Sequence, residues 1–188
     1  MSRILSGALA LALLSGAAQA VEFNSLRVDQ SRMAFAYRQM NVPMEGQFKR
    51  FSGQLRFDPA KPALAKAALD IQLASIDTGS TDGDEEVAGK LWFNTAKFPV
   101  ARFVSTSVKP LGNNRYQVSG KMSIKGKTRE ISTPATFRQE GASAVFEGSL
   151  VLKRADFGIG EGMWADYGTV ANEVQIKFRL VATRAVTK

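Results

Sequence analysis

Residues 174–180 have the sequence VQIKFRL, in which apolar and polar side chains alternate. Val174, Ile176, Phe178 and Leu180 fall on one face, and the residues between them are Gln, Lys and Arg. A period of two is typical of a β-strand with one buried and one solvated face. Slipping the register by one residue would expose the whole apolar set, so the segment predicts a strand of fixed register.

Four earlier segments show the same alternation. Their apolar faces are Met33, Phe35 and Tyr37; Leu69, Ile71 and Leu73; Tyr116, Val118, Met122 and Ile124; and Phe146, Gly148, Leu150 and Leu152. Gly112-Asn113-Asn114, Lys125-Gly126-Lys127 and Glu140-Gly141 supply residues that tolerate the positive φ of tight hairpins. Short turns between neighbouring strands predict antiparallel pairing. We therefore expect an all-β fold of about eight antiparallel strands in a barrel just wide enough for one small ligand. A β-sandwich is the alternative.

One segment interrupts the strand pattern. Residues 81–92, TDGDEEVAGKLW, suit a short helix that would cover a mouth of the barrel. Asp82 is the expected N-cap, with Glu85 three residues later as in a capping box. The acidic residues that follow would lie in the first turn, where the helix dipole favours negative charge.

The first residues predict export. Arg3 precedes an apolar run from Ile4 to Leu14, and Ala18-Gln19-Ala20 has the small-x-small pattern that signal peptidase cleaves. The alternative is a buried N-terminal helix. We expect residues 1–20 to be a cleaved signal peptide, residues 21–188 to form one domain, and the protein to be periplasmic.

Composition removes much of the chemical repertoire. The chain has no Cys and no His, which excludes thiol nucleophiles, imidazole bases and the metal sites built from them. The net charge is +8, with the positive residues scattered along the chain. Such a charge suits a solvated basic surface, or contact with an anionic membrane or an acidic partner. Export argues against nucleic acid.

Two motifs resemble functional sites, but neither has the context that the chemistry needs. Asp82, Asp84 and Glu86 resemble the start of a calcium loop, but Val87 stands where the turn glycine is needed. Residues 158–162, GIGEG, resemble a phosphate-binding loop, but a turn and another strand follow instead of a helix. No G-x-S-x-G elbow occurs. We therefore predict no catalytic residue, no metal site and no enzymatic activity.

Aromatic residues and methionines gather along the strands and in residues 92–103. Such side chains are adaptable and bury large areas, so they suit a site for a long apolar ligand. A solid barrel core would use the same residues, and the pattern leaves both interpretations open.

Several landmarks in order and spacing resemble the YceI family of exported, lipocalin-like proteins that bind polyisoprenoids. They are Val28-Asp29 with Ser31; Gly46-Gln47-Phe48; Phe51-Ser52-Gly53; Ala74-Ser75-Ile76-Asp77-Thr78; Trp92-Phe93-Asn94; Phe98-Pro99; Phe103 and Ser105; residues 120–126, GKMSIKG; residues 154–159, RADFGI; and Asn172-Glu173-Val174. Members often carry His at positions that correspond here to Arg32 and Glu86, which puts any His-dependent head-group contact in doubt.

The resemblance implies an eight-stranded barrel with a lid-like helix and a long apolar channel, so that residues 21–188 would be a YceI-like lipid-binding domain. Its function would be to bind or carry an isoprenoid lipid, such as a quinone or a polyprenyl chain, with no further cofactor. The alternative is a non-catalytic accessory protein of a membrane redox or stress system, with a filled barrel. Expected partners are the amphiphilic lipid and, transiently, an anionic membrane surface or a membrane redox protein. The residues expected at the channel or its mouth are Phe35, Tyr37, Phe48, Phe51, Trp92, Phe103, Phe157 and Trp164, with Arg38 or Asp166 at the polar head.

Overall fold

The computed structural model describes residues 22–184. The strands are β1 (Ser25–Leu26), β2 (Arg32–Gln39), β3 (Val42–Phe48), β4 (Phe51–Arg56), β5 (Lys66–Gln72), β6 (Ile76–Asp77), β7 (Val100–Gly112), β8 (Arg115–Ile124), β9 (Lys127–Glu140), β10 (Ser143–Lys153) and β11 (Glu173–Thr183). The one α-helix of the described residues is α1 (Thr81–Ala88), and short 3-10 turns are η1 (Val28–Gln30), η2 (Pro62–Leu64), η3 (Leu73–Ser75), η4 (Arg154–Phe157) and η5 (Gly162–Trp164). The predicted signal peptide lies outside the described residues.

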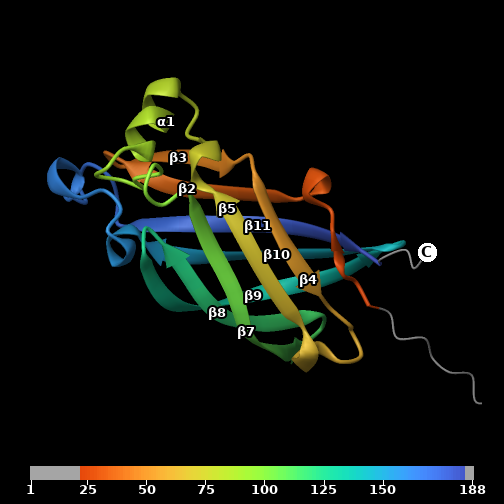
Figure 1. The fold of residues 1–188 in the computed structure, drawn as a ribbon. Helices are drawn as coiled ribbons and strands as arrows, with labels where there is room; N and C mark the ends of the chain where they lie inside the picture. Colours follow the sequence, from red (N-terminus) through yellow and green to blue (C-terminus); the bar gives the residue numbers. More distant parts are fainter. Residues whose placement is uncertain (1–21, 185–188) are drawn as a thin grey trace, which may run out of the picture.

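All strands belong to one antiparallel sheet that curls into a half-barrel (Figure 1). The order is β4-β5-β7-β8-β9-β10-β11-β2-β3-β6, with β1 paired to the end of β11. The predicted all-β antiparallel class with one helix is confirmed, and the sandwich alternative is wrong. The predicted number of about eight strands is too low for two physical reasons. Strands β1 and β6 have two residues each, and β3 carries Pro43 and Gly46, which blur its alternation.

The predicted hairpin turns are present. Gly112, Asn113 and Asn114 all have positive φ between β7 and β8, and Lys125 and Gly126 have it between β8 and β9. The turn between β2 and β3 is built in the same way by Met40 and Asn41, with φ of 47° and 65°.

The two ends of the half-barrel are closed differently. At one end the N-terminal segment joins strands that are not neighbours in the sheet. Phe23 exchanges two backbone hydrogen bonds with Phe57, at 2.8 and 2.9 Å, while the Arg27 amide donates to the Val181 carbonyl. Behind this seam lies a cluster of rings 5.0–6.1 Å apart, which we call the aromatic plug: Phe23, Phe57, Tyr116, Phe137 and Phe146. We call this end of the molecule the plug end.

At the opposite end, α1 and the long loop between β10 and β11 lie beyond the ends of the strands (Figure 1). We call it the helix end. The capping of α1 differs from the prediction. The N-cap is Ser80, whose hydroxyl accepts from the Gly83 amide at 3.1 Å, and the helix ends at Ala88. Asp82 is a first-turn residue, and the Asp84 carboxylate instead accepts from the amide and the hydroxyl of Thr78, at 2.7 and 2.8 Å.

Candidate ligand-binding site

The half-barrel encloses a cavity of about 610 Å³. The predicted inward faces of β2, β5, β8, β10 and β11 contribute nearly all of their members to its wall. The residues from those faces are Met33, Phe35, Tyr37, Leu69, Ile71, Leu73, Val118, Met122, Ile124, Phe146, Leu150, Leu152, Val174, Ile176, Phe178 and Leu180. The volume lies within the ~300–1,000 Å³ typical of sites for small molecules.

Charge is nearly absent from the wall of the cavity. Of all the residues that line it, only Asp82, Glu86 and Arg154 have ionisable acidic or basic side chains. The two carboxylates belong to α1, so the acidic part of the lining is confined to the helix end. The body of the cavity offers apolar surface to a ligand.

Polar groups that are free to bind a ligand occur on the inward face of β2. Tyr37 and Gln39 both line the cavity, and neither side chain forms a hydrogen bond within residues 22–184. Burial raises the pKa of the Tyr37 hydroxyl above its ordinary value, so this group stays protonated and can donate a hydrogen bond. Along the inward face of β2, the side chains thus change from apolar Phe35 to polar Gln39 as the strand approaches the β2–β3 turn.

One side-chain hydrogen bond joins α1 to the loop between β10 and β11. The Trp164 indole nitrogen, from the loop before β11, donates to the Glu86 carboxylate of α1 at 2.7 Å. Both residues line the cavity, and the two partners are 78 positions apart in the chain. The bond therefore links the lid helix to the loop across the cavity.

Arg154 holds the loop that carries Trp164. The residue is 3 % exposed, and its guanidinium donates five hydrogen bonds of 2.7–3.2 Å, all to backbone carbonyls. The acceptors are the carbonyls of Ile159, Gly160, Trp164, Val170 and Ala171. The guanidinium also lies over the rings of Trp92 and Tyr167, at 5.6 and 5.3 Å. Burial lowers the pKa of Arg154 from its ordinary value, and the nearby Tyr167 and Asp166 oppose that shift.

Seven of the ten predicted site residues lie together around the cavity. They are Phe35, Tyr37, Phe48, Trp92, Phe103, Phe157 and Trp164. Phe51 instead packs in the core, 7 % exposed and outside the cavity wall.

The two residues predicted at the polar head also lie outside the wall. Arg38 is exposed and donates to the Asn41 carbonyl at 2.6 Å. Asp166 is exposed and accepts from the Gly168 amide at 2.9 Å. Strand direction explains Arg38, because it lies between the inward residues Tyr37 and Gln39. Asp166 is occupied in stabilising its own turn.

The sequence analysis did not select three residues that shape the site. Gln39 continues the period-two face of Phe35 and Tyr37, so extending that face by one step would have found it. Glu86 drew attention only in the rejected calcium motif and as a departure from the family pattern. Arg154 left no signal in the alternation, because it lies where β10 ends and its partners are carbonyls of a loop.

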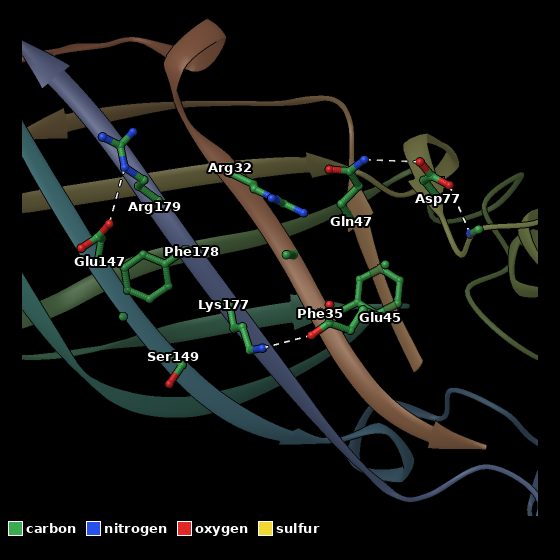
Figure 2. Close-up of a pocket in the computed structure, with 14 residues that line it drawn as sticks. Arg32, Phe35, Glu45, Gln47, Asp77, Glu147, Ser149, Lys177, Phe178 and Arg179 are labelled. Carbon is green, nitrogen blue, oxygen red and sulfur yellow. Dashed lines mark hydrogen bonds and ion pairs between the residues drawn. The ribbon is translucent and has the colours of Figure 1, made fainter. Parts of the chain in front are cut away.

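A second depression, of about 750 Å³, lies on the outer surface of β10, β11, β2 and β3 (Figure 2). Small residues form its floor, and side chains of both signs stand around it. Lys177 pairs with Glu45 at 3.3 Å, and Arg179 pairs with Glu147 at 3.5 Å (Figure 2). Since these charges largely neutralise one another, the depression shows no preference for a ligand of either sign.

Known proteins resemble this chain in both sequence and fold. Residues 25–182 match the family model described as the YceI-like domain. A UPF0312 protein from Azotobacter vinelandii is 34 % identical over 137 residues, which cover 70 % of this chain and 69 % of the relative. A UPF0312 protein from Pseudomonas fluorescens is 34 % identical over 151 residues, which cover 74 % of each chain.

Solved structures share the fold. The crystal structure of Burkholderia cenocepacia BcnA is 46 % identical and superposes with a TM-score of 0.83, covering 85 % of this chain and 100 % of that one. A polyisoprenoid binding domain from Saccharophagus degradans is 20 % identical, with a TM-score of 0.70 and coverage of 89 % and 100 %. The second likeness, at that identity, concerns the fold alone.

Proposed function

The chain belongs to the YceI-like family, and on that premise we propose that it is a non-catalytic binding or carrier protein for a long isoprenoid lipid. The lipid, a quinone or a polyprenyl chain, occupies the apolar cavity of the half-barrel. The observation that carries the proposal is the cavity itself, about 610 Å³ of space walled by apolar side chains. Each buried CH₂ of a ligand contributes about 0.8 kcal/mol, so a hydrocarbon tail binds such a wall without any polar contact. The Saccharophagus degradans domain of the same fold, described as polyisoprenoid binding, agrees with this proposal.

The charges of the lining favour an uncharged head group. Arg154 is the one cation of the wall, and all of its N–H donors are already directed to backbone carbonyls. A phosphate would therefore meet no free cation and would face the carboxylates of Asp82 and Glu86. A hydroxyl or carbonyl oxygen, by contrast, can accept from Tyr37 or Gln39. Within the isoprenoid lipids the proposal thus prefers quinones and free alcohols to phosphates.

A filled barrel, the alternative from the sequence, does not agree with a cavity of this volume. The cavity therefore favours a binding role over an accessory role with a filled barrel. The proposal places the protein in the periplasm, exported by the signal peptide expected at residues 1–20. It includes a transient contact with an anionic membrane surface or a membrane redox protein.

Native mass spectrometry of the protein purified from its own host tests the proposal. We expect a co-purifying lipid, and we expect added quinone to bind more tightly than a polyprenyl phosphate of equal length. An empty spectrum together with no binding of added quinone or polyprenol contradicts the proposal.

A matched pair of variants locates the lipid in the cavity. Val118→Phe adds volume to a half-buried residue of the wall, whereas Val151→Phe makes the same change at a side chain that is 56 % exposed. We expect Val118→Phe to reduce the amount of bound lipid and Val151→Phe to leave it unchanged. Equal lipid in both variants would place the ligand elsewhere.

A further inference from the structure

The plug end carries a surface of leucines and unpaired cations. It consists of Leu64 in η2 and Leu111 in the β7–β8 hairpin, with Lys61, Lys66, Lys109 and Arg115 around them. We call it the Leu/Lys surface. Leu64 is 63 % exposed and Leu111 is 49 % exposed, which places both among the exposed large apolar residues of the described chain.

These residues come together because η2 packs against β7. The Ala67 amide, just after Lys66, donates to the Ser105 hydroxyl of β7 at 2.8 Å, which ties the start of β5 to the second half of β7. Arg115 lies opposite Gly112 across the hairpin, next to Leu111. In Figure 1 the yellow η2 turn and the green β7–β8 hairpin lie side by side, far from α1.

The cations of this surface are not neutralised. Lys61, Lys66, Lys109 and Arg115 are all exposed, and none forms a side-chain hydrogen bond or an ion pair within the part of the chain that the structure describes. Two carboxylates belong to neighbouring segments, and neither forms an ion pair with these cations in the described part of the chain. Glu22 pairs with Arg56 at 2.8 Å, and Asp58 accepts from the Ala60 amide at 2.8 Å.

At the opposite end, helix α1 carries acidic residues in its first turns, with no basic residue in its last turn. Exposed cations such as Lys90 and Lys153 lie at the same end and offset part of that charge. A negatively charged surface would therefore attract the unpaired cations of the plug end more strongly than the helix end.

We propose that the Leu/Lys surface docks on a lipid bilayer with anionic head groups. Lysine is depleted from protein–protein interfaces, whose centres favour aromatic anchors. This surface is rich in lysine and includes no aromatic residue, so a bilayer fits it better than an acidic protein. Lysines attract anionic lipids, and apolar side chains at turn tips enter the boundary between head groups and acyl chains. The proposed function includes a transient membrane contact, and the present proposal assigns that contact to a particular surface. It rests on the proposed function in that respect alone.

Docking at the plug end directs the cavity mouth away from the membrane. A protein bound in this orientation would present its lid helix and its cargo to a partner on the far side. The docking itself does not require a filled cavity, because Phe57 and the rest of the aromatic plug lie between this end and the ligand.

Vesicle co-sedimentation tests the proposal, using the protein as its host produces it. We expect binding to phosphatidylcholine vesicles that contain roughly a third phosphatidylglycerol, and little binding to phosphatidylcholine alone. Since exposed charges are screened by salt, binding should fall by about tenfold in about 0.5 M NaCl. Equal binding to both kinds of vesicle overturns the proposal, as does binding of an acidic protein partner at this surface without binding of either vesicle.

Matched variants separate the surface from the net charge. Lys61→Glu with Lys109→Glu should weaken vesicle binding by more than about tenfold. Lys90→Glu with Lys153→Glu makes the same change of net charge at exposed cations of the helix end, and should weaken it by less than about threefold. A similar loss in both pairs overturns the proposal.

A second set isolates the leucines and the cavity. Leu64→Ala with Leu111→Ala should weaken vesicle binding, while Val104→Ala with Val151→Ala, also exposed, should not. Val118→Phe should leave vesicle binding unchanged while it reduces bound lipid. If it abolishes vesicle binding, attachment depends on the cavity and the proposal is wrong. If the native protein holds no lipid but still binds anionic vesicles through this surface, only the proposed function fails.

Discussion

Arg154 buries a positive charge without an ion pair in the described part of the chain, and backbone carbonyls take the place of a counterion. Burying an unpaired charge is costly unless every donor is satisfied, and here five hydrogen bonds satisfy the guanidinium. The same bonds satisfy five carbonyls of the loop over residues 159–171. The residue thus adds to the backbone hydrogen bonds that the loop forms through η5 and with β2.

Arg154→Met should lower the free energy of unfolding by on the order of 3 kcal/mol, because buried carbonyls lose charged donors that are worth about 1.5–3 kcal/mol each in net terms. Arg154→Lys should restore only part of the loss, since an ammonium has three donors and cannot reach five acceptors. Urea unfolding measures both. Arg32→Met, at an exposed guanidinium, is the control and should stay within about 0.5 kcal/mol of the native value. A similarly small change for Arg154→Met would contradict the role given to its hydrogen bonds.

Asp77 anchors the start of the lid segment, and its charge makes that anchor depend on pH. The Lys49 ammonium at 2.9 Å, the Gln47 amide at 3.3 Å and the Gly79 amide hold the pKa of the Asp77 carboxyl below its ordinary value. A carboxyl whose folded pKa is lowered adds stability above its unfolded pKa, and this stability is lost as the pH falls through the folded pKa. The contribution is therefore complete at neutral pH and disappears in acid.

We expect the difference in unfolding free energy between the native protein and Asp77→Asn to shrink as the pH falls from about 6 to about 3. Urea titrations at each pH measure it. Asp156→Asn, the control, removes an exposed carboxyl that forms no hydrogen bond or ion pair within residues 22–184, and it should change the unfolding free energy little. A constant difference for Asp77→Asn would mean that its lowered pKa does not contribute to stability.

At the scale of elements, α1 and the loop before β11 form a lid in two parts. The bond from Trp164 to Glu86 joins the loop to α1 itself, and the amides of Gly160 and Glu161 both donate to the Leu91 carbonyl just after the helix. Few other contacts tie α1 to the sheet: it packs mainly on β6 and η3. Loss of the bond should therefore change the opening of the lid more than the stability of the barrel.

Glu86→Ala should increase the dissociation rate of bound quinone several-fold while it lowers the unfolding free energy by no more than about 1 kcal/mol, because the bond is exposed. Glu86→Gln keeps an acceptor oxygen and should remain close to the native rate. Stopped-flow transfer of quinone to excess apo-protein measures the rates. If Glu86→Ala and Glu86→Gln release the ligand equally fast, the negative charge at this position, and not the hydrogen bond, controls release.

The strands and the lid helix of this fold could be predicted from sequence, whereas the contacts that join the two parts of the lid could not. A face such as Val174 to Leu180 repeats at every second residue, and burial on one side leaves a direct trace in composition. The lid depends on single long-range contacts, and nothing near Trp164 in the sequence indicates that its partner is Glu86. The error in the helix cap has a local cause. Ser80 and Asp82 are both good N-caps, and Asp84 is committed to Thr78, a contact that fixes where the helix begins.

At the scale of the whole molecule, the alternation could not show whether the barrel is hollow. The inward side chains are the same types that fill a solid core, and the space left between them depends on how far the sheet curls. At the plug end the curl is held by the pairing of Phe23 with Phe57, which are 34 residues apart, and at the helix end by α1. The pairing of Phe23 with Phe57 uses backbone atoms, so it leaves no pattern in the composition. Hence the inward faces were predicted correctly and the cavity itself became visible only in the structure.

A hollow core also makes the stability of the molecule depend on its cargo. An apolar cavity forgoes the dispersion contacts of a packed interior, and a lipid restores them in the folded state only. A ligand present at about 100 times its dissociation constant stabilises the folded state by about 2.7 kcal/mol. For a domain of this size, removing the lipid should therefore lower the melting temperature by about 5 to 10 °C. Calorimetry before and after extraction measures it, with mass spectrometry to verify that the lipid is gone.

Two comparisons make that measurement specific to the cavity. Added quinone should restore the melting temperature of the extracted protein, whereas a water-soluble quinone head group without its tail should not, because the tail supplies the buried area. In Val118→Phe, where a ring already occupies part of the space, extraction should cause a smaller drop than in Val151→Phe. If extraction leaves the native melting temperature unchanged, the lipid is not part of the folded core, and the cavity is stable when empty.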